Sequence, residues 1–154
     1  MSHRYKILNQ KGINFLTMTT VGWIDVFTRK KYRDIIIENL QYCRAHKGLR
    51  IHGYVIMSNH IHLVASTDGK KKLSQIIRDF KSYTAKIIMN DIAENTKESR
   101  RSWLMYLFSY FARKNRRSYE HQFWQSDNHP MLLESVKFIQ QKLDYIHKNP
   151  IRAG

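Results

Sequence analysis

The feature that most constrains the fold is a pair of strand-like segments separated by a short turn. Residues 49–56 and 60–66 are rich in β-branched and apolar side chains, and Met57-Ser58-Asn59 lies between them. Ser and Asn between two such runs are typical of a turn, and so short a connection joins neighbouring antiparallel strands. The sequence therefore predicts an antiparallel sheet built around residues 49–66.

Further segments with regular periodicity surround this pair. Residues 14–21 are typical of a strand, and residues 30–46 have the apolar spacing of a helix that Gly48 ends. A second long helix is expected over residues 72–92, and a basic, aromatic helix over residues 97–119. The expected order along the chain is therefore one strand, one helix, two strands and then the two helices.

The last third of the chain predicts one more strand and one more helix. Residues 122–132 hold a possible fourth strand, interrupted by Asp127-Asn128-His129-Pro130. A final helix over residues 133–149 carries an apolar stripe of Leu132, Val136, Ile139, Leu143 and Ile146. The whole order predicts an α+β fold: a ferredoxin-like antiparallel sheet with helices on one face and a C-terminal helix that carries Tyr145.

Composition limits the class of protein. The 154 residues suit a single domain spanning residues 1–154, and the hydrophobic fraction of 42% supports a real core. A single cysteine, Cys43, and the lack of a long apolar run or signal-like N-terminus predict a cytoplasmic protein that does not enter a membrane. The formal net charge of +15 favours a nucleic-acid partner over a merely soluble basic protein.

The pair His60 and His62 is the most informative motif. Residues two apart on a strand point to the same face, so the two imidazoles are expected side by side while Ile61 turns to the core. Such a pair can bind one divalent ion and leave positions open for a phosphodiester. The alternative is a solvated pair of histidines, and His52 on the preceding strand is only a weak candidate for a third ligand.

Tyr145 and Asn149 lie four residues apart, so they share one face of the final helix, away from the apolar stripe. A phenol that attacks a phosphodiester conserves the energy of the broken bond in a phosphotyrosine link. Asn149, just before Pro150, can offer its carbonyl oxygen as a third metal ligand. On the local sequence alone, the favoured interpretation is an ordinary exposed tyrosine and a helix-ending asparagine.

Together, the runs GYVIMSNHIHLV, HQFWQSDNHP and KLDYIHKNPIRAG resemble the single-tyrosine HUH transposases, in particular the REP-associated tyrosine transposase-like branch. The resemblance implies a Mg²⁺ or Mn²⁺ ion on His60, His62 and Asn149, with Tyr145 as the nucleophile. It also implies a homodimer, an active site formed in some relatives in trans, and cleavage of single-stranded DNA beside hairpins that leaves a 5′-phosphotyrosine. Other HUH branches carry an acidic third ligand, which this chain lacks.

Tyr83, on the second long helix, is the competing nucleophile. Aromatic residues between 103 and 111 are expected to divide between the core and platforms for unpaired bases. Two basic groups are the candidate DNA-binding residues: Lys70, Lys71, Lys72, Arg78 and Lys81, then Arg113, Lys114, Arg116 and Arg117.

Two alternatives remain open at this point. The first is a domesticated protein of the same fold that binds hairpin DNA or RNA without cutting it. The second is a rolling-circle initiator or relaxase nuclease, although these usually carry extra domains or more acidic metal sites.

Overall fold

The computed structural model describes residues 6, 7 and 9–153, except for the side chains of residues 149–153. In chain order the elements are β1 (Asn14–Thr19), the 3-10 turns η2 (Val21–Trp23) and η3 (Val26–Thr28), α1 (Lys30–His46), β2 (Leu49–Ile56), β3 (His60–Thr67), α2 (Leu73–Glu94), α3 (Arg101–Lys114), β4 (Met131–Leu132) and α4 (Val136–Ala153). Among these residues no helix combines the length and apolarity needed to cross a membrane.

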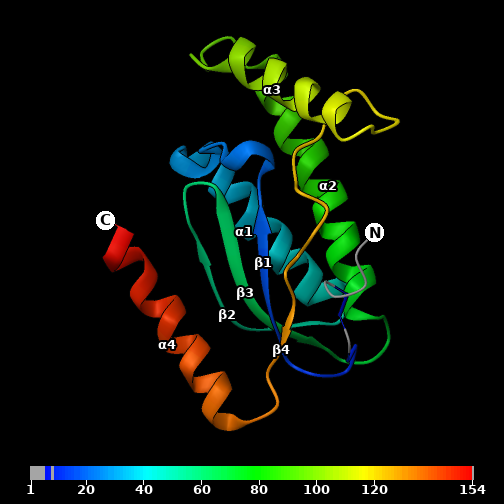
Figure 1. The fold of residues 1–154 in the computed structure, drawn as a ribbon, viewed down its shortest axis with the longest axis vertical. Coiled ribbons are helices and arrows are strands. Elements are labelled where there is room, and N and C mark those ends of the chain that lie inside the picture. The colour runs from blue at the N-terminus through cyan, green and yellow to red at the C-terminus, as the bar shows by residue number, and fades with distance from the viewer. Residues whose placement is uncertain (1–5, 8, 154) are drawn as a thin grey trace.

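The four strands form one antiparallel sheet in the order β2-β3-β1-β4. This order, with α1 and α2 connecting the strands, is the βαββαβ arrangement of ferredoxin-like folds, and α3 is inserted between α2 and β4 (Figure 1). The predicted fold class is confirmed.

The two faces of the sheet carry cores of different size. On one face Ile61 and Leu63 of β3 join the main hydrophobic core beneath α1 and α2. On the opposite face Val64 belongs to a smaller cluster with Phe15 of β1 and Ile146 of α4. The strand alternation therefore places His62 on the α4 side, because it shares the face of Val64.

Helix α4 runs along the β2 side of the sheet (Figure 1) and approaches the backbone of β2 closely. Ile146 is 2% exposed, a burial that stabilises the contact by about 1.5–3 kcal/mol. Gly53 permits the approach, since a Cβ atom there would lie 2.7 Å from Cδ2 of Leu143. The apolar side of α4 is thus seated on β2 with Tyr145 beside it.

Most predicted elements are confirmed, with α1 at the predicted bounds and β2 and β3 within one residue of them. The predicted helix over 97–119 is shorter, because buried Glu98 accepts hydrogen bonds from Tyr32, Arg29 and Arg100 and residues 95–100 form turns. The fourth strand is reduced to two residues.

The predicted apolar stripe is wrong at Val136. This side chain is 81% exposed at the start of α4, whereas Leu133, three residues earlier, is buried in the small cluster. The chain enters the core at Leu133 and turns before the helix begins, so the first turn of α4 lies beyond the sheet.

Candidate active site

The two histidines lie side by side on β3, as their spacing predicts. Their ring centroids are 4.7 Å apart at an interplanar angle of 73°. His62 is 6% exposed and His60 is half-buried, while Ile61 between them is fully buried on the other face. Both imidazoles therefore face the α4 side of the sheet.

Each histidine is oriented by a hydrogen bond at Nδ1. Nδ1 of His62 lies 3.0 Å from Oγ1 of Thr17, its register partner on β1. Nδ1 of His60 lies 2.8 Å from Oδ1 of Asn59. These contacts leave Nε2 as the ring nitrogen that each histidine can offer to a ligand.

The surroundings favour neutral imidazoles. Burial lowers the pKa of His60, and burial together with the charges of His60 and Lys142 lowers the pKa of His62 to about 4. A neutral imidazole keeps the lone pair that a divalent cation requires, so the pair fits a metal site at neutral pH.

Within the part of the chain that the structure describes, no cluster of three or more His, Cys, Asp or Glu side chains can hold a metal. Among the described residues, a third protein ligand would therefore be of another kind. Asn149 belongs to α4, but its side chain lies outside the described residues.

Tyr145 reaches the histidines within the same chain. Its ring is 38% exposed, and its centroid lies 5.4 Å from that of His62 in an edge-on arrangement. Phe15 completes the group, stacked on His62 at 5.1 Å and 22° and edge-on to Tyr145 at 6.2 Å. The tertiary structure thus brings together the two predicted motifs that are farthest apart in the sequence.

Lys142 adds a positive charge to this group. Its Nζ lies 5.7 Å from the centroid of Tyr145 and 4.8 Å from that of Phe15. A cation at this distance can stabilise an anion that binds or develops beside the phenol.

Sequence reasoning did not identify Lys142, Thr17, Phe15 or Asn59. Lys142 stands three residues before Tyr145, and Asn59 stands directly before His60. Their closeness in sequence to predicted site residues could have identified both. Thr17 and Phe15 had none, because only the pairing of β1 with β3 places them.

The structure separates Tyr83 and His52 from this group. Tyr83 is 55% exposed on α2 and lines a cavity of about 580 Å³ between α1 and α2. The sheet lies between that cavity and the histidines. His52 is engaged elsewhere, with its Nε2 2.8 Å from Oγ of Ser66.

The candidate DNA-binding residues divide into two regions, the start of α2 and the end of α3. Lys81 differs from the rest, because its ammonium donates hydrogen bonds of 2.7 Å to the backbone oxygen of Gln125 and to Oδ1 of Asn128. Burial lowers the pKa of Lys81 to about 8, against the opposing effect of Asp127. Lys81 therefore stabilises the position of the segment before β4 through these hydrogen bonds. Contact between Lys81 and DNA stays a prediction.

The aromatic residues of the last third of the chain divide between the surface and the core. Trp103, Tyr106 and Tyr110 are exposed, whereas Phe108 is in the core. Trp124 is 6% exposed, and its indole nitrogen donates to Oγ1 of Thr84 at 3.1 Å, so it is a core residue.

Residues 17–126 match the family model described as "Transposase IS200 like". The chain belongs to this transposase family. The matched segment contains both histidines and ends before α4, so Tyr145 lies outside it. No curated protein matches the sequence significantly.

Two solved structures share the fold of this IS200-like transposase. One is described as the REP-associated tyrosine transposase bound to a REP hairpin; it is 17% identical with a TM-score of 0.61, over 100% of this chain and 75% of that one. The other is a proposed transposase from Deinococcus radiodurans R1, 13% identical with a TM-score of 0.52, over 96% of each chain. The resemblance of the sequence motifs to transposases is confirmed by the family model.

Proposed function

We propose that this transposase cleaves and rejoins single-stranded DNA through a 5′-phosphotyrosine on Tyr145. The observation that carries the proposal is the edge-on contact of Tyr145 with His62, at 5.4 Å between ring centroids in one chain. A phenol beside a pair of neutral imidazoles on the α4 side of the sheet combines a nucleophile with a site for a charge-neutralising cation.

The chemistry follows from the phenol. Oη of Tyr145 attacks the phosphorus of a phosphodiester, the Oη–P bond forms and the P–O3′ bond breaks. The phenolic proton is lost, and the departing O3′ takes up a proton to become a free hydroxyl. Attack by another 3′-hydroxyl on the phosphotyrosine reverses these changes and joins two strands without ATP.

His60 and His62 are the residues that would hold a divalent metal, Mg²⁺ or Mn²⁺, with Asn149 as the proposed third ligand. When bound, such a cation polarises the phosphodiester. The protein's own contribution is orientation: Thr17 and Asn59 hold the imidazoles, and Lys142 holds positive charge beside Tyr145.

The proposed substrate is single-stranded DNA next to a hairpin. The net charge of +15 supports a polyanionic partner, and the REP-associated relative is described with a REP hairpin bound. We further propose a homodimer in which each active site is built in cis, since Tyr145 contacts His62 of its own chain.

The decisive experiment mixes the full chain with labelled hairpin DNAs carrying single-stranded extensions and Mn²⁺, then resolves covalent adducts on a denaturing gel. The wild type and Tyr83→Phe are expected to form an adduct, and Tyr145→Phe is not. Fully double-stranded DNA serves as the substrate control.

An adduct that survives Tyr145→Phe and disappears in Tyr83→Phe would move the nucleophile to α2. Tight hairpin binding without any adduct, over a series of hairpins, would favour a protein that binds DNA without cutting it.

A further inference from the structure

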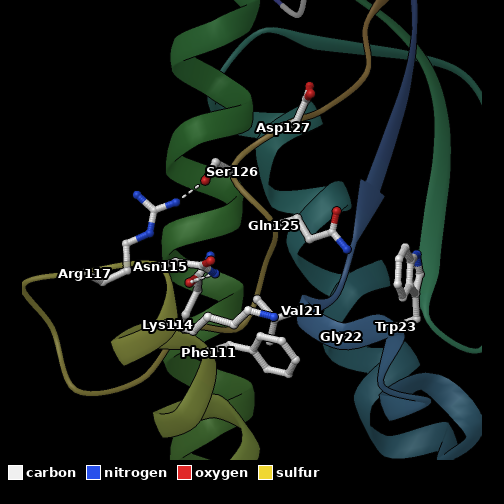
Figure 2. Close-up of a pocket in the computed structure, with 11 residues that line it drawn as sticks. Val21, Gly22, Trp23, Phe111, Lys114, Asn115, Arg117, Gln125, Ser126 and Asp127 are labelled. Carbon is white, nitrogen blue, oxygen red and sulfur yellow. Dashed lines mark hydrogen bonds between the residues drawn. The ribbon is translucent and has the colours of Figure 1, made fainter. Parts of the chain in front are cut away.

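A pocket of about 520 Å³ lies at the end of the sheet (Figure 2), and Tyr145 does not line it. One wall is the η2 turn with Gly22 and Trp23, and the opposite wall is the end of α3 with Phe111 and Lys114. The segment after α3 supplies Arg117 and Gln125. Its volume falls within the range of about 300–1,000 Å³ typical of small-ligand sites.

We propose that this pocket binds one unpaired nucleotide of the DNA substrate, with its base against Trp23 and its phosphate toward Lys114 and Arg117. The inference rests on the proposed activity on single-stranded DNA and assigns it a recognition site separate from the cleavage site.

The aromatic wall is exposed, and the backbone that carries it is held by hydrogen bonds. Trp23 is 68% exposed, although an indole in water forgoes a large favourable burial. Its backbone has φ 50° and follows Gly22 at φ 61°, a conformation uncommon for a bulky residue. Hydrogen bonds fix it, from its N–H to the Thr20 oxygen at 3.2 Å and from Nδ2 of Asn59 to its own oxygen at 3.2 Å. An exposed indole on a hydrogen-bonded backbone turn is a platform for stacking.

Gly22 shapes the opposite side. A Cβ atom there would lie 2.5 Å from the Phe111 ring, so only glycine lets this ring lie against the η2 turn. Lys114 stands over the same ring, with Nζ 5.8 Å from its centroid. Figure 2 shows Phe111 and Lys114 across the pocket from Trp23.

The polar groups favour a nucleotide over a bare anion. Lys114 and the Arg117 guanidinium, which is anchored by a hydrogen bond to Ser126, offer positive charge for a phosphate. Gln125 donates through Nε2 to the Thr20 oxygen at 3.2 Å, and among the described residues none donates to its Oε1. Asp127 also lines the pocket, and its Oδ1 accepts a hydrogen bond from the backbone N–H of His129 at 2.8 Å. Acceptors suit the amino groups of bases and would repel an isolated phosphate.

Asn59 connects this pocket to the histidines. Its Nδ2 donates to the oxygen of Trp23, and its Oδ1 lies 2.8 Å from Nδ1 of His60. The platform residue and the first histidine are therefore held by one side chain. A nucleotide bound on Trp23 is positioned to set the register of the strand that crosses His60.

The test measures affinity of the non-cleaving Tyr145→Phe chain for a hairpin DNA with single-stranded extensions, into which an abasic site is moved one position at a time. One abasic position is expected to weaken binding about 5- to 150-fold, the loss of one base–aromatic stack. Trp23→Ala should weaken binding of the intact DNA by a similar factor and become insensitive to that abasic position. Tyr42→Ala is the matched control, because Tyr42 is an aromatic residue 54% exposed on α1 and does not line the pocket.

A second variant tests the phosphate side independently. Lys114→Ala should lower the slope of log affinity against log salt by about one while keeping the abasic sensitivity. Circular dichroism checks that each variant folds.

Unchanged affinity of Trp23→Ala for the intact DNA would overturn the nucleotide pocket. So would a loss of affinity for the combination of Trp23→Ala and abasic DNA that equals the product of the two separate losses, because the base and the indole would then act independently. These outcomes differ from failure of the proposed cleavage, which is the absence of a wild-type adduct and leaves the binding comparison intact.

Discussion

Oδ1 of Asn59 lies 2.8 Å from Nδ1 of His60, while Nδ2 of the same amide donates to the oxygen of Trp23. Because the amide nitrogen is committed to a carbonyl, the amide oxygen faces the imidazole as an acceptor. Nδ1 of His60 must then carry the proton, which leaves the lone pair on Nε2. One asparagine in a turn thus selects the tautomer of the first histidine.

Asn59→Ala is expected to weaken Mn²⁺ binding about 10- to 100-fold, because His60 loses the acceptor that holds its ring and tautomer. Isothermal titration with Mn²⁺ measures the change. Asn90→Ala, an exposed asparagine on α2, is the control and should bind as the wild type does. Equal affinity in both variants would show that Asn59 does not orient the site.

Gly53→Val is expected to slow formation of the covalent adduct at least about tenfold, because the new side chain displaces Leu143 and with it the helix that carries Tyr145. The main core does not include residue 53, so the far-ultraviolet circular dichroism should be retained. Adding Leu143→Ala vacates the space and should restore part of the rate, with Leu143→Ala alone as reference. A Gly53→Val chain with full activity would argue against close docking of α4 in the active state.

Lys142→Ala is expected to slow adduct formation about 10- to 100-fold without preventing it. The expected loss of rate is smaller than that caused by removing a fully buried donor that stabilises the transition state. The reason is that Lys142 is half-exposed beside Tyr145, so water weakens its electrostatic effect. Lys142→Arg keeps the charge and should retain most of the rate. Lys137→Ala removes an exposed lysine from the first turns of the same helix and separates a local effect from the loss of net charge. Equal rates in the two alanine variants would remove Lys142 from the reaction.

The hydrogen bonds around Glu98 predict that part of the free energy of unfolding is lost in acid. Burial alone would raise its pKa, but hydrogen bonds from Tyr32, Arg29 and Arg100 outweigh burial and lower the pKa from 4.5 to about 2. A depressed folded-state pKa stabilises the fold above about pH 4.5, and this contribution is lost as the pH falls toward 2. It amounts to about 3 kcal/mol at neutral pH.

Glu98→Gln should therefore unfold in less urea at pH 7, with a difference from the wild type that narrows below about pH 4. Glu94→Gln, at the exposed end of α2, is the matched control. A difference that stays constant with pH would show that the charge of Glu98 does not stabilise the fold.

Local patterns in the sequence determined most elements and the direction of several side chains. The helical spacing of residues 30–46 and the alternation of β3 depend on neighbours only a few residues apart, so α1 and the shared face of His60 and His62 were predictable. The stripe through Leu143 and Ile146 likewise indicated which side of α4 packs on the protein. Its extension to Val136 failed, because a helix start depends on where the preceding chain enters the core.

Contacts between distant segments were decided only by the tertiary structure. The pairing of Thr17 with His62 depends on strand register, and the meeting of Tyr145 with His62 depends on how α4 docks across Gly53. Tyr83, on a basic helix, was the competing nucleophile in the sequence, yet α2 covers the opposite face of the sheet. Periodicity specifies which face of an element is apolar, whereas packing of those faces selects which polar residues meet.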